Sequence, residues 1–314
     1  MAYKKKSKSK QKNSLIYAII AIVVFILSAL GLYQNPQILD GISGLFDTGG
    51  TTVSLDGVLS VHYIDIGQGD AELIVTPDGK AMLIDAGPNS NEKDLMSYLD
   101  SLKITVLEYA VFTHPHEDHI GGADAVFEKI DVKRVIMPDT VHNTATFEKM
   151  LEAIDKNDTE VIIPKSGDEF TLGEAKFKIL GPNKSGYKSL NDWSIVLRLD
   201  YGQNSFMFTG DCEKLAEKEM LNVYSARDFS CDVLKIGHHG SSTSTSDEFL
   251  LACSPKYAVI SCEKGNTYGH PHKETIDILT KHNIETLRTD LSGTIIFTSD
   301  GTSISHYYPD QAKA

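Results

Sequence analysis

Apolar residues along this chain form one long uncharged run near the N-terminus and many short runs after it. The long run, residues 15–33, has 19 residues, enough to cross a bilayer as a helix. Residues 34–57 contain a proline, scattered glycines and the sequence Thr-Gly-Gly-Thr-Thr, a composition typical of a linker. Beyond them, short apolar segments alternate with amphipathic ones, which predicts a domain of strands and helices over residues 58–310.

This domain is expected to be of the α/β (α+β) class. The predicted helices are 92–102, 123–129, 146–157, 213–221 and 273–282. The predicted strands are 60–66, 71–76, 81–85, 106–112, 132–137, 161–164, 170–180, 194–199, 205–209, 233–236, 257–261 and 293–298. Strand-rich segments recur in two halves, each with helices. We therefore expect two sheets packed face to face with helices outside, an αββα sandwich.

The N-terminal tail decides how the apolar run is interpreted. Residues 1–14 carry six lysines and no acidic residue, so this tail is expected to stay in the cytoplasm. The run 15–33 then predicts a single transmembrane anchor in the cell membrane, with the domain outside. A cleaved signal peptide, which would leave a secreted domain, is the alternative, but no small-x-small cleavage site is evident.

Charge and cysteine content narrow the function classes. The net charge is −13 despite the basic tail, so the domain should repel nucleic acid in general and touch phosphates only locally or through a metal. No stripe of lysines and aromatic residues marks a strand-binding groove, and sequence-specific nucleic-acid binding is not expected. The four cysteines form no C-x-x-C pair, and buried free thiols are the default expectation.

The densest chemistry lies at residues 113–122, directly after a predicted buried strand. Here His114, His116, Asp118 and His119 follow the spacing H-x-H-x-D-H, and a Gly-Gly pair turns the chain. Such a loop places imidazoles and a carboxylate at the carboxyl edge of a sheet, where α/β folds keep their sites. The first two histidines can bind one ion and the Asp-His pair a second, which suits a two-metal site.

Together with Thr-Gly-Asp at 209–211, this spacing resembles the metallo-β-lactamase superfamily. Four further stretches resemble the hydrolase domain of competence DNA-uptake proteins of the ComEC family: Asp-Ile-Gly-Gln-Gly-Asp at 65–70, Leu-Ile-Asp-Ala-Gly at 83–87, Leu-Lys-Ile-Gly-His-His-Gly-Ser at 234–241 and Asn-Thr-Tyr-Gly-His-Pro at 266–271. The resemblance covers about residues 58–300 and implies a sandwich of the metallo-β-lactamase type. The multi-helix channel of that family is not in this sequence, so we expect a single domain on one anchor.

The resemblance also implies roles for particular residues. Asp211 matches the carboxylate that bridges two ions, although a helix N-cap is compatible with that position too. One of His238 and His239 should complete the second site with Asp118 and His119, while the other faces substrate or supports the ligands. Asp85 and Asp70 are expected to orient ligands from behind. A chain turn after a strand is the alternative role of Asp85.

One departure from the superfamily pattern concerns the first site. A histidine usually precedes the Thr-Gly-Asp strand, but residues 147–211 contain none, and Asn191 stands at about that place. An amide oxygen is a harder and weaker ligand than imidazole. The expected cofactor is therefore one or two divalent ions, zinc or manganese, with a first site that binds weakly, prefers manganese or fills only with substrate.

The expected chemistry is hydrolysis by a metal-bound hydroxide, which is a strong nucleophile near neutral pH. Asp118, His270 and Asn191 are the candidate catalytic residues. His270 would protonate the leaving group or bind phosphate, unless it serves only its turn. Hydroxyl groups that could bind phosphate oxygens, unless they form an ordinary loop, belong to Ser241, Ser242 and Thr243.

These features favour a membrane-anchored, extracytoplasmic phosphodiesterase or nuclease, acting for example on single-stranded DNA during DNA uptake. A second possibility is a metallohydrolase of another ester: a cell-wall phosphodiester, a phosphorylcholine group, a β-lactam or a thioester. A third is a binding domain that keeps its metal without catalysis. The intact H-x-H-x-D-H spacing disfavours this last class, and the missing histidine keeps it open.

Overall fold

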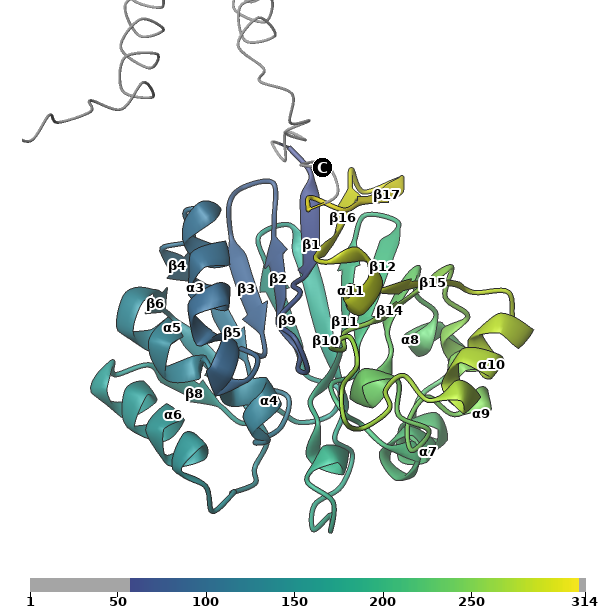
Figure 1. Cartoon of the computed structure of the whole chain (residues 1–314), viewed down its shortest axis with the longest axis horizontal. Coiled ribbons are helices and arrows are strands. Elements are labelled where there is room, and N and C mark those ends of the chain that lie inside the picture. Colours follow the sequence, from purple (N-terminus) through teal and green to yellow (C-terminus); the bar gives the residue numbers. More distant parts are fainter. Residues whose placement is uncertain (1–56, 311–314) are drawn as a thin grey trace, which may run out of the picture. The chain divides into compact units, whose positions relative to one another are not determined.

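A computed structural model describes residues 57–310, which fold into two large β-sheets packed face to face with helices on their outer sides (Figure 1). This is the predicted αββα arrangement. The long apolar run at 15–33, the basic tail and most of the linker lie outside the described residues. Among the residues described, no helix is long and apolar enough to span a membrane.

The first sheet has eight strands, antiparallel on one side and parallel on the other. In spatial order they are β17 (Ile304–Tyr307), β16 (Ile295–Ser299), β1 (Leu59–Tyr63), β2 (Glu72–Val75), β3 (Ala81–Ile84), β5 (Tyr109–Val111), β7 (Arg134–Ile136) and β8 (Glu160–Ile162). Strands β3, β5, β7 and β8 run parallel to one another. The carboxyl ends of β3 and β5 therefore meet at one edge of the sheet.

The second sheet has seven strands and the same mixture of directions. Its order is β15 (Glu285–Arg288), β14 (Tyr257–Ile260), β13 (Val233–Lys235), β12 (Asn204–Phe208), β11 (Val196–Tyr201), β10 (Ala175–Gly181) and β9 (Glu169–Leu172). Strands β12 to β15 are parallel. The loops that follow β12, β13 and β14 thus leave the sheet at the same edge, and they carry the remaining motifs.

Helices cover the outer faces of both sheets (Figure 1). Those on the first sheet are α3 (Glu92–Ser101), α5 (Ala123–Lys129) and α6 (Ala145–Lys156), with the short α4 (Glu117–Ile120) beside them. Those on the second sheet are α7 (Lys214–Val223), α8 (Ala226–Phe229), α9 (Asp247–Cys253) and α10 (Lys273–Lys281). A one-turn helix, α11 (Thr289–Ser292), leads into β16.

Alternation along the strands builds three apolar layers. In β12, Phe206 and Phe208 face the space between the sheets, whereas Met207 packs under the helices of the second sheet. In β3, Met82 faces the central layer and Leu83 faces the helices of the first sheet. Because successive side chains point to opposite faces, a strand buried on both sides reads as a continuous apolar run.

Several sequence predictions need correction. The single strand predicted at 170–180 is wrong: the chain turns at Gly173, where φ is 56°, and forms the hairpin β9–β10. The predicted strand 106–112 is divided, because β4 (Val106–Leu107) pairs separately with β6 (Asp131–Val132). Helices α8, α9 and α11 and strands β15 and β17 were not predicted, since each has only four to seven residues. The expectation of buried free thiols is confirmed for all four cysteines.

Candidate metal centre

The H-x-H-x-D-H residues lie in the loop after β5 and in the one-turn helix α4. His114 and His119 are fully buried, and the ring atoms His114 Nε2 and His116 Nδ1 face each other at 2.9 Å. Asp118 reaches toward the second sheet, where its Oδ2 lies 3.2 Å from His239 Nε2. The loop thus presents its side chains to the carboxyl edge of the other sheet.

Asp211, just after β12, lies between two groups of imidazoles. Its Oδ1 is 3.3 Å from His119 Nε2 and 3.7 Å from His239 Nε2. Its Oδ2 is 3.7 Å from His114 Nε2 and 3.6 Å from His238 Nε2. We define a first ligand group of His114, His116 and Asp211, and a second of Asp118, His119, Asp211 and His239, each compact enough to hold one ion.

The donor atoms of these groups fit a divalent cation. Asp211 Oδ1 and His119 Nε2 are buried and lack a hydrogen-bond partner among the described residues. An unsatisfied buried polar atom costs about 1–3 kcal/mol, and a cation between the two atoms would remove that cost. Imidazole suits zinc and carboxylate suits manganese, so this mixed set is compatible with either ion.

His238 and His239 follow β13 in the short helical turn η3 (Gly237–Gly240). Both have left-handed backbone angles, with φ of 52° and 54°. This conformation is uncommon for residues other than glycine and directs the two rings to different oxygens of Asp211. His239 therefore belongs to the second ligand group, whereas His238 lies on the side of the first.

Asp85, at the end of β3, contacts the second group from behind. Its carboxylate accepts hydrogen bonds from the Thr113 N–H at 2.8 Å and the Thr113 hydroxyl at 2.7 Å. Its Oδ2 is also 2.7 Å from His119 Nδ1. A histidine that donates Nδ1–H to a carboxylate presents Nε2 as the ligand atom, which is the arrangement expected of an orienting carboxylate.

Asp70, in the loop between β1 and β2, is hydrogen-bonded to the loop that carries the H-x-H-x-D-H residues. Its N–H donates to Asp118 O at 3.1 Å, an approach that only a glycine at 69 permits, because an added Cβ would lie 2.4 Å from that oxygen. Asp70 Oδ1 lies 3.2 Å from His239 Nδ1, whose N–H is directed at Ser261 O, 3.1 Å away. Asp70 thus lies beside His239, a member of the second ligand group.

Two buried ionisable residues here were not predicted from the sequence. Lys235 Nζ donates to Asp70 Oδ2 at 2.8 Å and to Ile236 O at 3.0 Å. Glu72 is buried nearby, and burial raises its pKa well above the usual value. For Lys235, the sequence did contain an indication of burial: the lysine lies inside the apolar run Leu-Lys-Ile, directly before the Gly-His-His-Gly turn.

The charges of the centre depend on one another. Burial alone lowers the pKa of His119 and of His239, but the carboxylates, above all Asp211, outweigh it. The pKa of His119 therefore lies well above its usual range, and that of His239 is about 10. Burial raises the pKa of Asp118 and Asp211, yet the imidazoliums hold both well below their usual range. A cation bound here would replace these protons.

Asn191 is buried in the turn η2 (Asn191–Trp193), close to His238. Its Nδ2 donates to Glu213 Oε1 at 3.3 Å and lies 3.4 Å from His238 Nδ1. Its Oδ1 is buried without a hydrogen-bond partner among the described residues. Asn191 thus lies behind His238, on the side of the first ligand group.

His270 lies over the histidines of η3. Its ring centroid is 5.5 Å from that of His238 and 6.1 Å from that of His239. Asn266 holds its backbone, with Nδ2 donating to His270 O at 2.6 Å and Oδ1 accepting from His270 N at 3.0 Å. Burial, His239 and His238 lower the pKa of His270 to about 4, so it is neutral near pH 7.

The predicted hydroxyl groups lie in the loop after η3. Thr243 Oγ1 is 3.1 Å from His238 Nδ1 and 3.1 Å from Ser241 Oγ. Ser241 is buried, whereas Thr243 is exposed. The Ser242 N–H donates to His272 Nδ1 at 2.9 Å, which ties this loop to the His270 loop. Thr243 therefore contacts His238 and Ser241 contacts Thr243, and their contact with a substrate stays a prediction.

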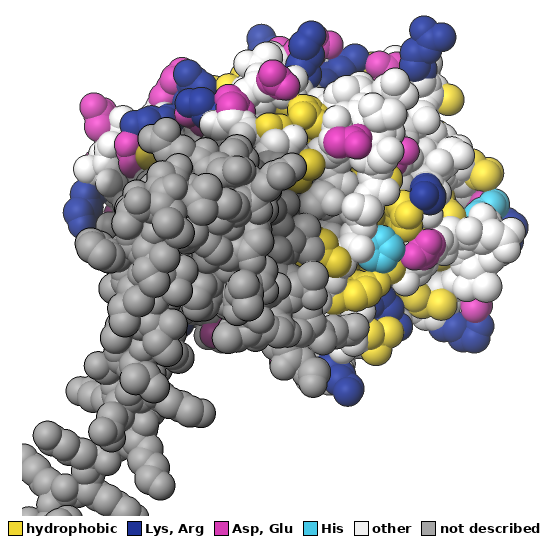
Figure 2. All heavy atoms as spheres, turned by 90° about the horizontal axis from the view of Figure 1, so that it is seen from above, with side chains coloured by type: hydrophobic (Ala, Val, Ile, Leu, Met, Phe, Trp, Pro, Cys, Tyr) yellow, Lys and Arg dark blue, Asp and Glu magenta, His cyan; other side chains and the backbone are white. Residues whose placement is uncertain are grey.

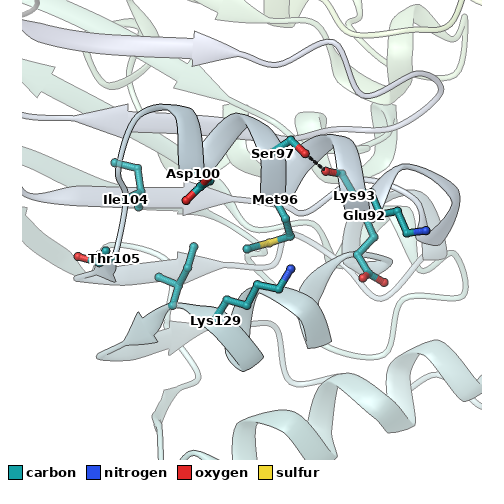
Figure 3. A pocket seen from close by; sticks show the side chains of 9 residues that line it. Glu92, Lys93, Met96, Ser97, Asp100, Ile104, Thr105 and Lys129 are labelled. Carbon is teal, nitrogen blue, oxygen red and sulfur yellow. Dashed lines mark hydrogen bonds between the residues drawn. The ribbon is translucent and has the colours of Figure 1, made fainter. Parts of the chain in front are cut away.

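A hollow of about 550 Å³ lies away from this centre, between α3 and the end of α5 (Figure 3). Its labelled lining includes Met96, Asp100 and Lys129, and Ser97 donates within α3 to Lys93 O at 2.7 Å. None of the predicted site residues contributes to it. The candidate site is therefore defined by its ligand atoms and not by the size of a cavity.

The fold and the ligand set define the class of this protein. Residues 64–263 match the family model of the metallo-beta-lactamase superfamily. The chain belongs to the metallo-β-lactamase superfamily, and proteins of this fold are metal-dependent hydrolases.

Its relatives are ComEC-like competence proteins. The chain is 36% identical over 252 residues to ComE operon protein 3 of Bacillus subtilis, covering 75% of this chain and 32% of that protein. It is 30% identical to Recombination protein 2 of Haemophilus influenzae (75% and 28% covered) and 30% identical to Competence protein ComA of Neisseria gonorrhoeae (76% and 32%). The chain thus spans about a third of the length of these relatives.

Solved structures of low identity share the fold. The metallo-beta-lactamase fold protein YhfI from Bacillus subtilis aligns with a TM-score of 0.53 and 13% identity, over 77% of this chain and all of that one. The metallo hydrolase Igni18 from Ignicoccus hospitalis aligns with a TM-score of 0.51 and 18% identity, over 76% and 98%. These likenesses concern the fold alone.

Proposed function

We propose that this chain is a metal-dependent phosphodiesterase that cuts nucleic acid, a nuclease of the ComEC type. The observation that carries the proposal is the position of Asp211 between two ligand groups, with one carboxylate oxygen toward each. A carboxylate so placed can hold two divalent ions close together, and paired ions clamp the attacking and leaving oxygens of a phosphodiester.

Charge supports an anionic substrate. Asp118 and Asp211 are the carboxylates of the two groups, and two divalent ions carry more positive charge than these two can neutralise. On the face shown in Figure 2, lysine and arginine side chains are interspersed with acidic ones. A phosphodiester would therefore be drawn to the metal centre itself.

When bound, the ions would activate water and stabilise negative charge on the attacked phosphate. The protein residues would position the attacking water and donate a proton or hydrogen bond to the substrate. Asp118, whose side chain is 31% exposed, is a ligand that borders solvent and can accept a hydrogen bond from the attacking water. His270, neutral near pH 7, can donate its ring N–H to a phosphate oxygen or to the leaving oxygen.

The relatives support DNA as the polymer. Two of them are named for competence or its operon and one for recombination, and all three are 30% identical or more over about 240 residues. We further propose that residues 15–33 anchor the chain in the cell membrane with the domain outside. A protease added to intact cells should then remove the domain and spare the tail.

The test uses the full-length chain, stripped of metal and reloaded with manganese or zinc. Substrates are single-stranded DNA, bis-p-nitrophenyl phosphate and a phosphorylcholine ester, and the variants are Asp118→Ala and Asp211→Ala. Asp247→Ala, an exposed carboxylate paired with Lys281, is the control. Metal-dependent cleavage of DNA, lost in both variants and kept in the control, is expected. Cleavage of the phosphorylcholine ester alone would replace the proposal with a cell-wall hydrolase.

A further inference from the structure

We propose that His238 supplies the third imidazole of the first ion, in place of the histidine that the sequence lacks before the Thr-Gly-Asp strand. The first ligand group, His114, His116 and Asp211, provides two nitrogens and one oxygen. Zinc sites have four positions and can expand to five, with one left to water in catalytic sites, so this group can accept a further protein ligand. The inference rests on the metal centre of the proposed function and assigns one more of its ligands.

The geometry around Asp211 carries the assignment. Asp211 Oδ2, the oxygen on the side of the first group, is 3.7 Å from His114 Nε2 and 3.6 Å from His238 Nε2. Ligand atoms about 2.0–2.1 Å from one tetrahedral ion lie roughly 3.3 Å apart. The two nitrogens therefore approach the same carboxylate oxygen at nearly the spacing of ligands on one ion.

The backbone of η3 holds His238 in this place. Its φ of 52° and ψ of 47° are left-handed, and the next residue, His239, is also left-handed. Its N–H donates to Gly210 O at 3.1 Å, which ties η3 to the turn that carries Asp211. Left-handed residues other than glycine are strained, and such strain concentrates at functional sites.

The other ring nitrogen of His238 is already engaged. His238 Nδ1 lies 3.1 Å from Thr243 Oγ1 and 3.6 Å from Glu213 Oε1, and both oxygens can accept its proton. Ligating histidines keep one nitrogen on such a partner and offer the other to the metal. In this tautomer Nε2 carries no proton. Its lone pair is free to bind a metal on the side of Asp211. Asn191, which donates to Glu213, then supports the arrangement from behind.

Two other residues compete for the same role. Asn191 Oδ1 is buried without a partner among the described residues, as an amide ligand would be before metal binds. His142 lies with its ring centroid 5.7 Å from that of His116, although its Nδ1 faces Pro115 O at 3.1 Å. His238 is favoured over both because its Nε2 lies beside an oxygen of Asp211, the carboxylate between the two ligand groups.

The test counts ions instead of measuring turnover. The full-length chain, its His238→Asn variant and the control His142→Ala are stripped and titrated with cobalt or manganese. Stoichiometry is read by calorimetry and elemental analysis, and cobalt absorption reports nitrogen ligands. Asparagine tolerates the left-handed conformation, and His238→Gly, which relieves it, is measured alongside. Circular dichroism verifies that each variant is folded.

The expected result is two ions for the wild type and for His142→Ala, and one tightly bound ion for both His238 variants. Binding of the second ion should weaken at least 100-fold in them. Two ions at unchanged affinity in the His238 variants, loss of an ion in His142→Ala, or only one ion in the wild type would each overturn the assignment. Two ions in the wild type without cleavage of any phosphodiester would overturn the proposed function and leave this assignment standing.

Discussion

Lys235 Nζ lies 2.8 Å from Asp70 Oδ2, and both side chains are only 1% exposed. Lys235 ends β13 of the second sheet, whereas Asp70 follows β1 of the first, so this buried ion pair joins the two halves of the sandwich. Burial raises the pKa of Asp70, but Lys235 and His239 outweigh it and lower the pKa to about 2. The pair thus keeps a carboxylate charged beside His239 without exposing it to solvent.

Removing the lysine should be costly. Lys235→Met would leave the buried carboxyl group of Asp70 without its cationic partner, and we expect a loss of about 3–5 kcal/mol in the free energy of unfolding. Lys178→Met, which breaks the part-exposed pair with Asp228, should cost at most about 1 kcal/mol. Urea unfolding compares the two. Equal costs would mean that the buried pair has no special part in joining the sheets.

The pH dependence of that pair follows from the direction in which the pKa of Asp70 is shifted. Because the folded pKa of Asp70 is below the usual 3.8, its contribution to stability is complete above about pH 4 and is lost as the pH falls toward 2. In Lys235→Met this acid-dependent loss should shrink, since the carboxylate is then already protonated at higher pH. Urea midpoints measured between pH 2 and pH 6 would show it.

Asp85→Asn should weaken metal binding without breaking the fold. The amide keeps the shape of the carboxylate but loses the charge that holds His119 Nδ1–H, and we expect the affinity of the second site to fall roughly 10–100-fold. Glu217→Gln alters a buried carboxylate that binds the backbone of Thr245 and Ser246, outside both ligand groups. Calorimetry should show normal affinity for that control, and an equal fall in both variants would contradict the orienting role of Asp85.

Metal binding should release protons. The raised pKa of His119, and that of His239 at about 10, mean that the metal-free centre holds protons near pH 7 that a cation must displace. Affinity should therefore rise with pH between 6 and 9, by up to about tenfold per unit for each proton released. Titrations in buffers of different ionisation enthalpy count these protons, and a count of zero would contradict this description of the centre.

His270→Ala should reduce kcat roughly 100-fold and leave the number of bound ions unchanged, because His270 lies over the histidines of η3 and outside both ligand groups. Its pKa of about 4 means that the neutral ring is present throughout the neutral range. The ratio of wild-type to variant rates should thus stay flat from pH 6 to pH 8. His272→Ala is the control, and a ratio that changes near pH 6.5 would show that the proton of His270 titrates there.

Much of this arrangement follows from the sequence. Apolar runs ending in polar loops predict strands, and parallel strands bring their carboxyl ends together. Asp85 and His114 thus share an edge of the first sheet, and Asp211 and His239 share an edge of the second. Short elements such as α9 and β15 were missed because a few residues show no clear periodicity.

What the sequence could not reveal depends on contacts between the sheets and on backbone angles. Lys235 and Asp70 are 165 residues apart, and nothing local to either indicates the other. Which of His238 and His239 joins the second group depends on two successive left-handed residues, which no pattern of apolar positions predicts. Asn191 was predicted near the first site by resemblance, and only the structure places it behind His238.

The most direct test of the central claim is cleavage of single-stranded DNA by the full-length chain after its metal is removed and manganese is restored, with Asp211→Asn measured beside it. Asp211 lies between both ligand groups, so its loss should affect both ions at once. We predict manganese-dependent cleavage by the wild type that falls by more than about 100-fold in the variant. Cleavage that continues without metal, or that is equal in Asp211→Asn, would contradict a two-metal phosphodiesterase.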